Sequence, residues 1–350
     1  MKRNLILWAL AAAALTLAAA GCGPDNNGDE TPVANLYIWV ADQPDKEVVI
    51  FNGAGQLIRV VGGFGTFNKP NAIDVYNADG SFWVCDFYSN RVRKFSASGN
   101  PIYATPGGGA EGLLLNPTML SVGQSNGECW IADRGHARII RLGADGAVKA
   151  KITGFAFPRT VAVDPESGDA WVADEMNNAV VKVMGSASGE VPVGQVELAR
   201  FTALPHPWAV AADANGFGWA TSHEQGRVIR VSPLGALAAS AAGFDNPVDV
   251  TVDETASAVY VVDEGAGRLV GLPRELQEGV GNYETVALFV VEGLSHPSDV
   301  FVDEEKGKIY VTEMGAGRVR VFDRTGKELT DIGGLAGPAA VAVWPAAGTP

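Results

Sequence analysis

The sequence predicts an all-β fold: a seven-bladed β-propeller with four antiparallel strands in each blade. A strand motif recurs seven times at intervals of 41 to 50 residues, a proline opens another strand in every unit, and the last unit is a lone proline-led strand. Units of about 40 to 50 residues with four short strands are typical of propeller blades. The 43 glycines and 19 prolines are spread along the chain, as expected for many short elements joined by turns.

The N-terminal residues precede the repeats and are predicted to be a secretory signal. Two basic residues come before an apolar run over residues 5–21, which is typical of a signal peptide and slightly short for a transmembrane helix. Ala19-Ala20-Gly21-Cys22 resembles the lipobox of bacterial lipoproteins, and Gly23 resembles an outer-membrane address. We therefore expect residues 1–21 to be a lipoprotein signal peptide, Cys22 to carry the lipid, and residues 22–35 to form a flexible tether. The resemblance implies a lipid-anchored protein of the bacterial cell envelope, on its periplasmic or surface side.

The second strand of each predicted blade has an aromatic residue, two small or β-branched residues and a polar residue. Its copies are Trp39–Asp42, Trp83–Asp86, Trp130–Asp133, Trp171–Asp174, Trp219–Ser222, Tyr260–Asp263 and Tyr310–Glu313. An arginine follows five residues after the last position in most units and opens a third, β-branched strand. We expect the five tryptophans at the first position to pack between blades.

The innermost strand of each blade is predicted to begin at a proline, where no ladder donor is lost. Its copies are Pro70–Val75, Pro117–Val122, Pro158–Val163, Pro207–Ala212, Pro247–Val252, Pro297–Val302 and Pro338–Val343. The first unit begins at Leu36 without such a strand, whereas the last copy has no strands after it. Placing the C-terminal strand in the N-terminal blade closes the ring and removes its open edges. Residues 36–350 are therefore predicted to be one domain.

The motif Pro-x-x-[Val/Ile]-x-Val-Asp, then aromatic-Val-x-Asp, then Arg, resembles the NHL-repeat family of propellers across residues 36–350. Seven blades also resemble streptogramin-lyase-type propellers. The resemblance implies the fold strongly, whereas a fold alone does not assign a function.

The loops before the innermost strand and after the second strand are predicted to share one face, and that face carries the candidate ligand-binding residues. Candidate ligand-binding residues in these loops are Lys69, Asn116, His206, His223, Glu224, Asn246, Glu264 and His296. Glu175 and Glu313 belong to the same loops, so we expect an acidic rim in the later blades. A histidine or asparagine before proline is also ordinary turn chemistry, and that alternative remains open for His206 and His296.

The repeated charged residues are interpreted as structural, because a scaffold needs them in every blade and catalysis needs a residue once. They are Asp86, Arg91, Asp133, Arg138, Asp263 and Arg268. No catalytic residue is assigned, since no nucleophile elbow, phosphate loop or His-Glu-x-x-His motif occurs. We predict no cofactor. The alternative is a divalent cation (Ca, Mg or Zn) held by His206, His223 and His296.

The leading hypothesis is a binding or scaffold propeller that recognises a protein, peptide or glycan; the alternative is a metal-assisted lyase or lactonase. With a net charge of −14, the chain is not expected to bind nucleic acid, and it meets the membrane only through its N-terminal lipid. A closed ring needs no second copy, so we expect a monomer. Cys85 and Cys129 are expected to be separate buried thiols rather than a disulfide.

Overall fold

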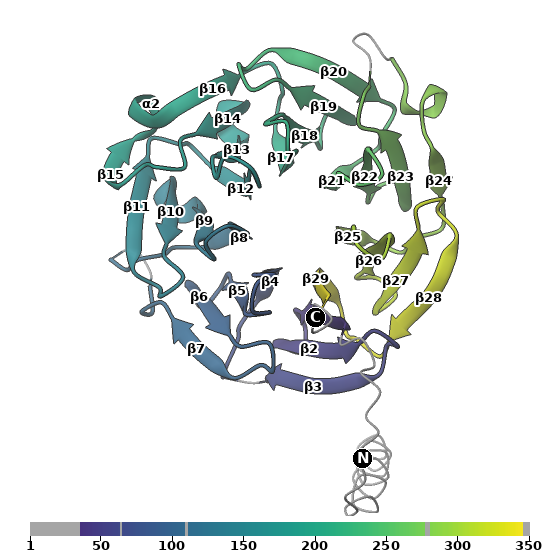
Figure 1. Ribbon diagram of the computed structural model, residues 1–350, viewed down its shortest axis with the longest axis horizontal. Helices are drawn as coiled ribbons and strands as arrows, with labels where there is room; N and C mark the ends of the chain where they lie inside the picture. The colour runs from purple at the N-terminus through teal and green to yellow at the C-terminus, as the bar shows by residue number, and fades with distance from the viewer. Residues whose placement is uncertain (1–35, 64, 109–110, 277–280, 346–350) are drawn as a thin grey trace, which may run out of the picture. The chain divides into compact units, whose positions relative to one another are not determined.

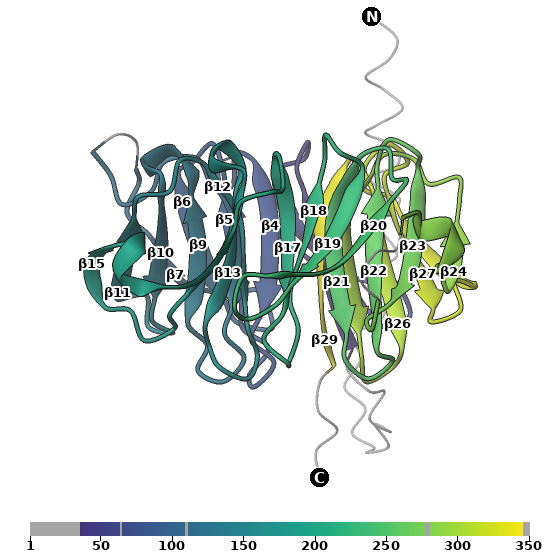
Figure 2. The ribbon, with the colours of Figure 1, turned by 90° about the horizontal axis from the view of Figure 1, so that it is seen from above.

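A computed structural model describes residues 36–63, 65–108, 111–276 and 281–345. Residues 36–345 form seven antiparallel sheets arranged as blades around a central axis (Figure 1). The strands run between the two faces of the ring, as the side view in Figure 2 shows. The seven-bladed propeller predicted from the sequence is confirmed.

The strands of each blade follow one another from the axis outward. Blades 1 to 3 contain β29 (Pro338–Pro345), β1 (Leu36–Asp42), β2 (Glu47–Asn52) and β3 (Leu57–Gly62); β4 (Pro70–Val75), β5 (Phe82–Asp86), β6 (Arg91–Phe95) and β7 (Pro101–Ala104); and β8 (Pro117–Val122), β9 (Cys129–Asp133), β10 (Arg138–Leu142) and β11 (Val148–Thr153). Blades 4 and 5 contain β12 (Pro158–Val163), β13 (Ala170–Asp174), β14 (Ala179–Val183) and β16 (Glu197–Phe201); and β17 (Pro207–Ala212), β18 (Gly218–Ser222), β19 (Arg227–Val231) and β20 (Leu237–Ala242). Blades 6 and 7 contain β21 (Pro247–Asp253), β22 (Ala258–Asp263), β23 (Arg268–Pro273) and β24 (Phe289–Val291); and β25 (Pro297–Asp303), β26 (Lys308–Glu313), β27 (Arg318–Asp323) and β28 (Glu328–Gly333).

The ring closes in blade 1, where strands from both ends of the chain pair. C-terminal β29 is innermost and lies antiparallel to β1, with Val341 opposite Val40. The predicted closure is therefore the observed one.

The aromatic residue of each second strand packs toward the next blade, and all seven are at most 1% exposed. Trp219 of blade 5, for example, lies in one cluster with Val259 and Val261 of blade 6. Tyr310 of blade 7 packs in the same way with Ile38 and Val40 of blade 1. Interlocking aromatics of this kind make the blades one continuous core.

The innermost strands leave one backbone edge facing the channel, and side chains of the preceding blade bond to it. The Thr118 hydroxyl donates to the carbonyl of Arg159 at 2.6 Å, and the carboxylate of Asp74 accepts from the N–H of Val122 at 2.7 Å. Unpaired backbone groups cost free energy when water is excluded. These bonds therefore tie neighbouring blades together around the channel.

A few segments lie outside the repeat. The connection after β14 contains β15 (Gly189–Pro192), which pairs in parallel with β11 and covers the outer edge of blade 3, and the short helix α2 (Val193–Val196). One-turn 3₁₀ helices span Arg134–His136, Glu175–Asn177 and Tyr283–Thr285. Cys85 and Cys129 are free and buried. Within the described ranges, no helix has the length and apolar character needed to cross a membrane. The predicted signal peptide, Cys22 and the tether lie outside the described residues.

Candidate functional site

The carboxylate at the end of the second strand holds the loop that precedes the innermost strand. Asp86 accepts the backbone N–H of Lys69 at 2.8 Å, and Asp263 accepts that of Asn246 at 2.6 Å. Asp133 accepts the N–H of Leu115 at 2.7 Å. A buried carboxylate satisfied by N–H donors fixes the backbone around it. The loops of the candidate face therefore start from rigid anchors.

The arginine that follows five residues later completes this anchor. Arg138 Nε donates to Asp133 at 2.8 Å, and Arg268 Nε donates to Asp263 at 2.9 Å. Arg268 also donates to the carbonyl of Gly243, which lies in the loop before β21. Arg91 is paired with Asp86 in the strand register, and its guanidinium lies against Gly107.

Loops from the predicted face surround a cavity of about 270 Å³ at the mouth of the channel. It is lined by Lys69, which was expected, and by Arg134, Arg159 and Trp208, which were not. Residues directly after the strand-opening proline line it repeatedly, namely Asn71, Thr118, Arg159, Trp208, Ser298 and Ala339. The position after the strand-opening proline could therefore have identified these six residues from the sequence.

The two arginines at the mouth lie flat against aromatic rings. The guanidinium carbon of Arg134 is 3.6 Å from the centre of the Phe157 ring, and Arg159 lies over Trp208. Burial lowers the pKa of Arg159 to about 10, although Glu175 opposes the shift. Burial also lowers the pKa of Arg134. Stacked guanidinium groups keep their N–H edges available in a fixed plane.

The charge at the mouth is only partly balanced. Glu175 forms an ion pair with Arg159 at 3.3 Å and also acts electrostatically on Arg134. Within the described ranges, Arg134 Nε is buried and has no hydrogen-bond partner. The ammonium of Lys69 lies 5.4 Å from the ring centre of Phe87. Three basic side chains, Lys69, Arg134 and Arg159, therefore line one cavity of an acidic protein.

The floor of the mouth is formed by Asp249 and Asp299 on neighbouring innermost strands. Asp249 accepts the N–H of Val300 and Asp299 accepts that of Val341, each at 2.9 Å. Burial raises the pKa of Asp249 to about 7, and burial together with Asp249 raises the pKa of Asp299 well above its ordinary value. The pair therefore holds a proton near neutral pH.

Two of the predicted histidines, His206 and His223, have Glu175 and Glu224 as charged neighbours. His206 lies between two carboxylates, with Nδ1 3.9 Å from Glu175 and Nε2 3.6 Å from Glu224. His223 stacks on Trp208 with ring centres 4.5 Å apart, and burial followed by the charge of Arg159 lowers its pKa. In the part of the chain that the structure describes, no three His, Cys, Asp or Glu side chains are placed to hold a metal ion.

The remaining predicted residues mostly shape the loops. Asn116, His206 and His296 have left-handed backbones, with φ of 49°, 46° and 47°. The N–H of Asn116 donates to Asn90 and that of His206 to Asn178, as in ordinary turns. The Asn246 amide donates to Glu264 at 3.1 Å. The expected acidic rim is partly neutralised, since Glu313 is buried and bonded to Arg318.

Solved structures with the same fold include enzymes and a protein of unknown function. Streptogramin B lyase is 13% identical, covers 88% of this chain and 91% of its own, and has a TM-score of 0.64. A putative 6-phosphogluconolactonase from Bacteroides fragilis is 14% identical over 90% and 99% of the two chains, with a TM-score of 0.67. A functionally unknown protein from Desulfotomaculum acetoxidans is 10% identical over 88% and 98%, with a TM-score of 0.69. No protein-family model and no curated protein matches the sequence.

Proposed function

We propose that this protein is a non-catalytic binding propeller that holds a carboxylate group of a protein, peptide or glycan ligand at the mouth of its channel. The observation that carries the proposal is the pair of stacked guanidinium groups, Arg134 and Arg159, beside Lys69. Glu175 pairs with Arg159, and the Asp249–Asp299 pair at the floor holds a proton near neutral pH, so these acidic groups balance only part of the three positive charges. A carboxylate from outside would meet donors that are already oriented and partly desolvated, which lowers the cost of binding.

The same charges favour an anionic ligand over the metal ion that a lyase or lactonase of the predicted kind would use. A divalent cation beside Lys69, Arg134 and Arg159 is repelled by each of them. We therefore expect no stoichiometric metal in the purified full chain. Stoichiometric Ca, Mg or Zn that is lost in a His206→Ala/His296→Ala double variant would instead support the metal-assisted alternative.

Binding to matched acidic and neutral probes tests the proposal. The probes are a glutamate peptide against its glutamine counterpart, and a trigalacturonate against its methyl ester. We expect the acidic member of one pair to bind the full chain, and Arg134→Gln or Lys69→Gln to weaken it at least about tenfold, the loss of one charge-assisted bond. Lys327→Gln, on the exposed turn after β27, is the charge-matched control. Equal affinity for acidic and neutral probes would refute the proposal.

We also propose that the propeller is held at the bacterial cell envelope by lipid on Cys22, with residues 22–35 as the tether. The support is the basic start, the apolar run and the Ala19–Cys22 motif of the sequence. A flexible tether of this kind would let the propeller reach a ligand on the periplasmic or surface side of the envelope.

A further inference from the structure

Four consecutive blades carry an aspartate six residues after the strand-opening proline, at the face opposite the channel mouth. They are Asp164, Asp213, Asp253 and Asp303, and each is at most 4% exposed. A carboxylate buried to this degree is costly unless a cation or hydrogen-bond donors compensate it. The partners of the four can therefore be compared directly.

Three of these aspartates have a basic partner, two of them from their own blade and the third, Asp253, from the next blade. Lys182 Nζ lies 2.9 Å from Asp164, and Arg230 lies 3.1 Å from Asp213. Both basic residues stand fourth in the third strand of their own blade, opposite the Trp of the second strand.

In blade 6 the basic partner of the aspartate comes from the neighbouring blade. Its fourth position in β23 is Gly271, which has no side chain to offer. Arg324 of blade 7 takes that role and donates to both oxygens of Asp253, at 2.7 and 3.0 Å. The carboxylate in blade 6 is therefore also compensated.

Asp303 in blade 7 lacks both arrangements. The fourth position of β27 is Val321, and the residue of blade 1 that corresponds to Arg324 is Gly53. Asp303 Oδ1 accepts the N–H of Lys306 at 3.0 Å. Asp303 Oδ2 is buried and has no hydrogen-bond partner in the described chain.

The charged neighbours of Asp303 do not replace the missing cation. Lys306 Nζ bonds to Glu305 at 2.7 Å, and within the described ranges neither Lys306 nor Lys308 forms an ion pair with Asp303. Burial raises the pKa of Asp303, the backbone N–H of Lys306 lowers it, Glu305 raises it, and the charges of Lys306 and Lys308 lower it. The carboxyl is thus left with an uncompensated oxygen.

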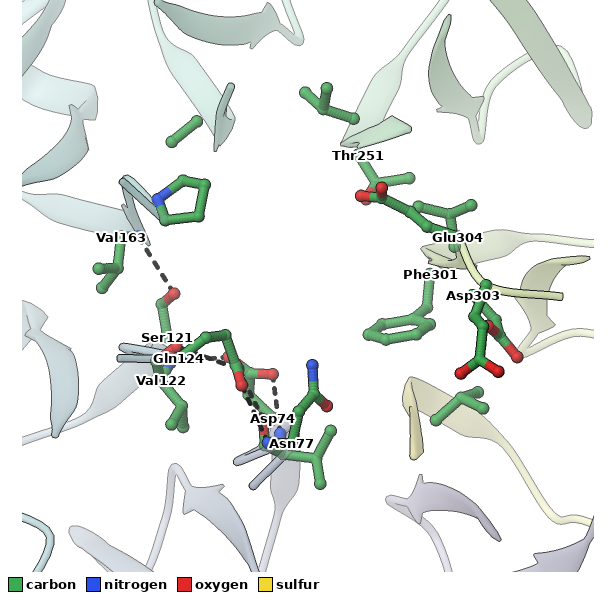
Figure 3. Close-up of a pocket in the computed structure, with 17 residues that line it drawn as sticks. Asp74, Asn77, Ser121, Val122, Gln124, Val163, Thr251, Phe301, Asp303 and Glu304 are labelled. Atoms are coloured by element: carbon green, nitrogen blue, oxygen red, sulfur yellow. Dashed lines mark hydrogen bonds between the residues drawn. The ribbon is translucent and has the colours of Figure 1, made fainter. Parts of the chain in front are cut away.

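A cavity of about 470 Å³ lies beside this carboxyl and opens on the face opposite the mouth. Asp303, Glu304 and Glu305 line one side of it. Figure 3 shows Asp303 and Glu304 across the cavity from Asn77 and Gln124. The volume and the negative wall suit a flat cationic group with several donors, and a guanidinium is that group.

We propose that this cavity binds the guanidinium group of an arginine presented by a partner protein, with Asp303 as its carboxylate. In blades 5 and 6 a guanidinium, from Arg230 or Arg324, compensates the aspartate at this repeat position from the side of the third strand, whereas the partner's guanidinium would reach Asp303 from the cavity. The site lies on the opposite face from the anion-binding mouth and does not depend on the function proposed for the mouth.

A titration of the full chain with capped pentapeptides tests this site. Gly-Gly-Arg-Gly-Gly is compared with the same peptide carrying citrulline, which keeps the shape of arginine without its charge. We expect the arginine peptide to bind and the citrulline peptide to bind at least about tenfold more weakly. Asp303→Asn should reduce binding of the arginine peptide by a similar factor.

A second variant places a cation of the protein itself next to Asp303. Val321→Lys places an ammonium at the position of Lys182 in blade 4, so it should raise the melting temperature and abolish peptide binding; Val321→Met is the uncharged control. Equal binding of the two peptides, or undiminished binding to Asp303→Asn, would overturn the proposal. Binding that survives in Asp303→Asn but disappears in Arg134→Gln would assign the peptide to the mouth instead, and would also overturn it.

Discussion

The carboxylate of Asp42 accepts a hydrogen bond from the backbone N–H of Gly337 at 2.8 Å, although 295 residues separate the two. The same carboxylate accepts the N–H of Ala336 at 2.7 Å. In blades 2, 3, 4, 6 and 7 this bond joins residues 17 or 18 apart, such as Asp174 and Phe157. One repeat interaction therefore serves as a local loop anchor in blade 4 and as the closure of the ring in blade 1.

Asp42→Asn should loosen the closure of the ring. The variant replaces a charged acceptor of two N–H groups by a weaker neutral one, which we expect to cost about 1–3 kcal/mol of unfolding free energy. Hydrogen exchange in β29 should accelerate, because this strand is held by the closure. Asp174→Asn is the matched control: it removes the same bonds within one blade, so β29 should exchange at its normal rate. Equal exchange in the two variants would contradict the closure role.

Lys182→Gln should strongly destabilise blade 4. The side chains of Lys182 and Asp164 are 6% and 2% exposed and lie 2.9 Å apart. Removing one partner of a buried ion pair leaves an uncompensated charge and typically costs about 3–5 kcal/mol. Chemical denaturation measures the loss, and adding Asp164→Asn should recover part of it. A Lys182→Gln variant as stable as the parent would show that the pair is not effectively buried.

Stability should depend on pH through the carboxyl pair at the channel floor. Burial raises the pKa of Asp249 from 3.8 to about 7, so the folded state binds its proton more tightly than the unfolded state does. This contribution to stability is complete below the unfolded pKa and is lost as the pH rises toward 7. Between about pH 4 and about pH 8, the melting temperature of the parent should therefore fall more steeply with rising pH than that of Asp249→Asn. Asp331→Asn, at an exposed site, should follow the parent.

Cys22→Ala should release the protein from the membrane fraction and block lipid-linked processing. The expectation follows from the Ala19–Cys22 motif, in which only the cysteine can carry the lipid. Fractionation and the mass of the mature protein measure the outcome. A variant that is processed and fractionated like the parent would contradict the lipid anchor.

The repeats explain why the fold was predictable from sequence and the site was not. A proline at the start of a strand, and an aromatic residue in the next, mark the same structural position in every blade, so seven copies reinforce one interpretation. Lys69 was expected at the channel mouth because it directly precedes such a proline. Arg134 was missed because no repeat position marks it, and Arg159 because the position after the proline carries a different residue type in nearly every blade.

The sequence by itself determined the number of blades, their strands, the closure by β29 and the burial of the five tryptophans of the second strands, because each depends on a local pattern of period two and on turn chemistry. Only the tertiary structure decided which charges meet. Arg159 meets Glu175 within blade 4, and Arg324 reaches Asp253 in the neighbouring blade across 71 residues, while Asp303 has no equivalent partner in the described chain. Electrostatic pairing depends on distances of a few ångströms between separate blades, and strand periodicity carries no information about such distances.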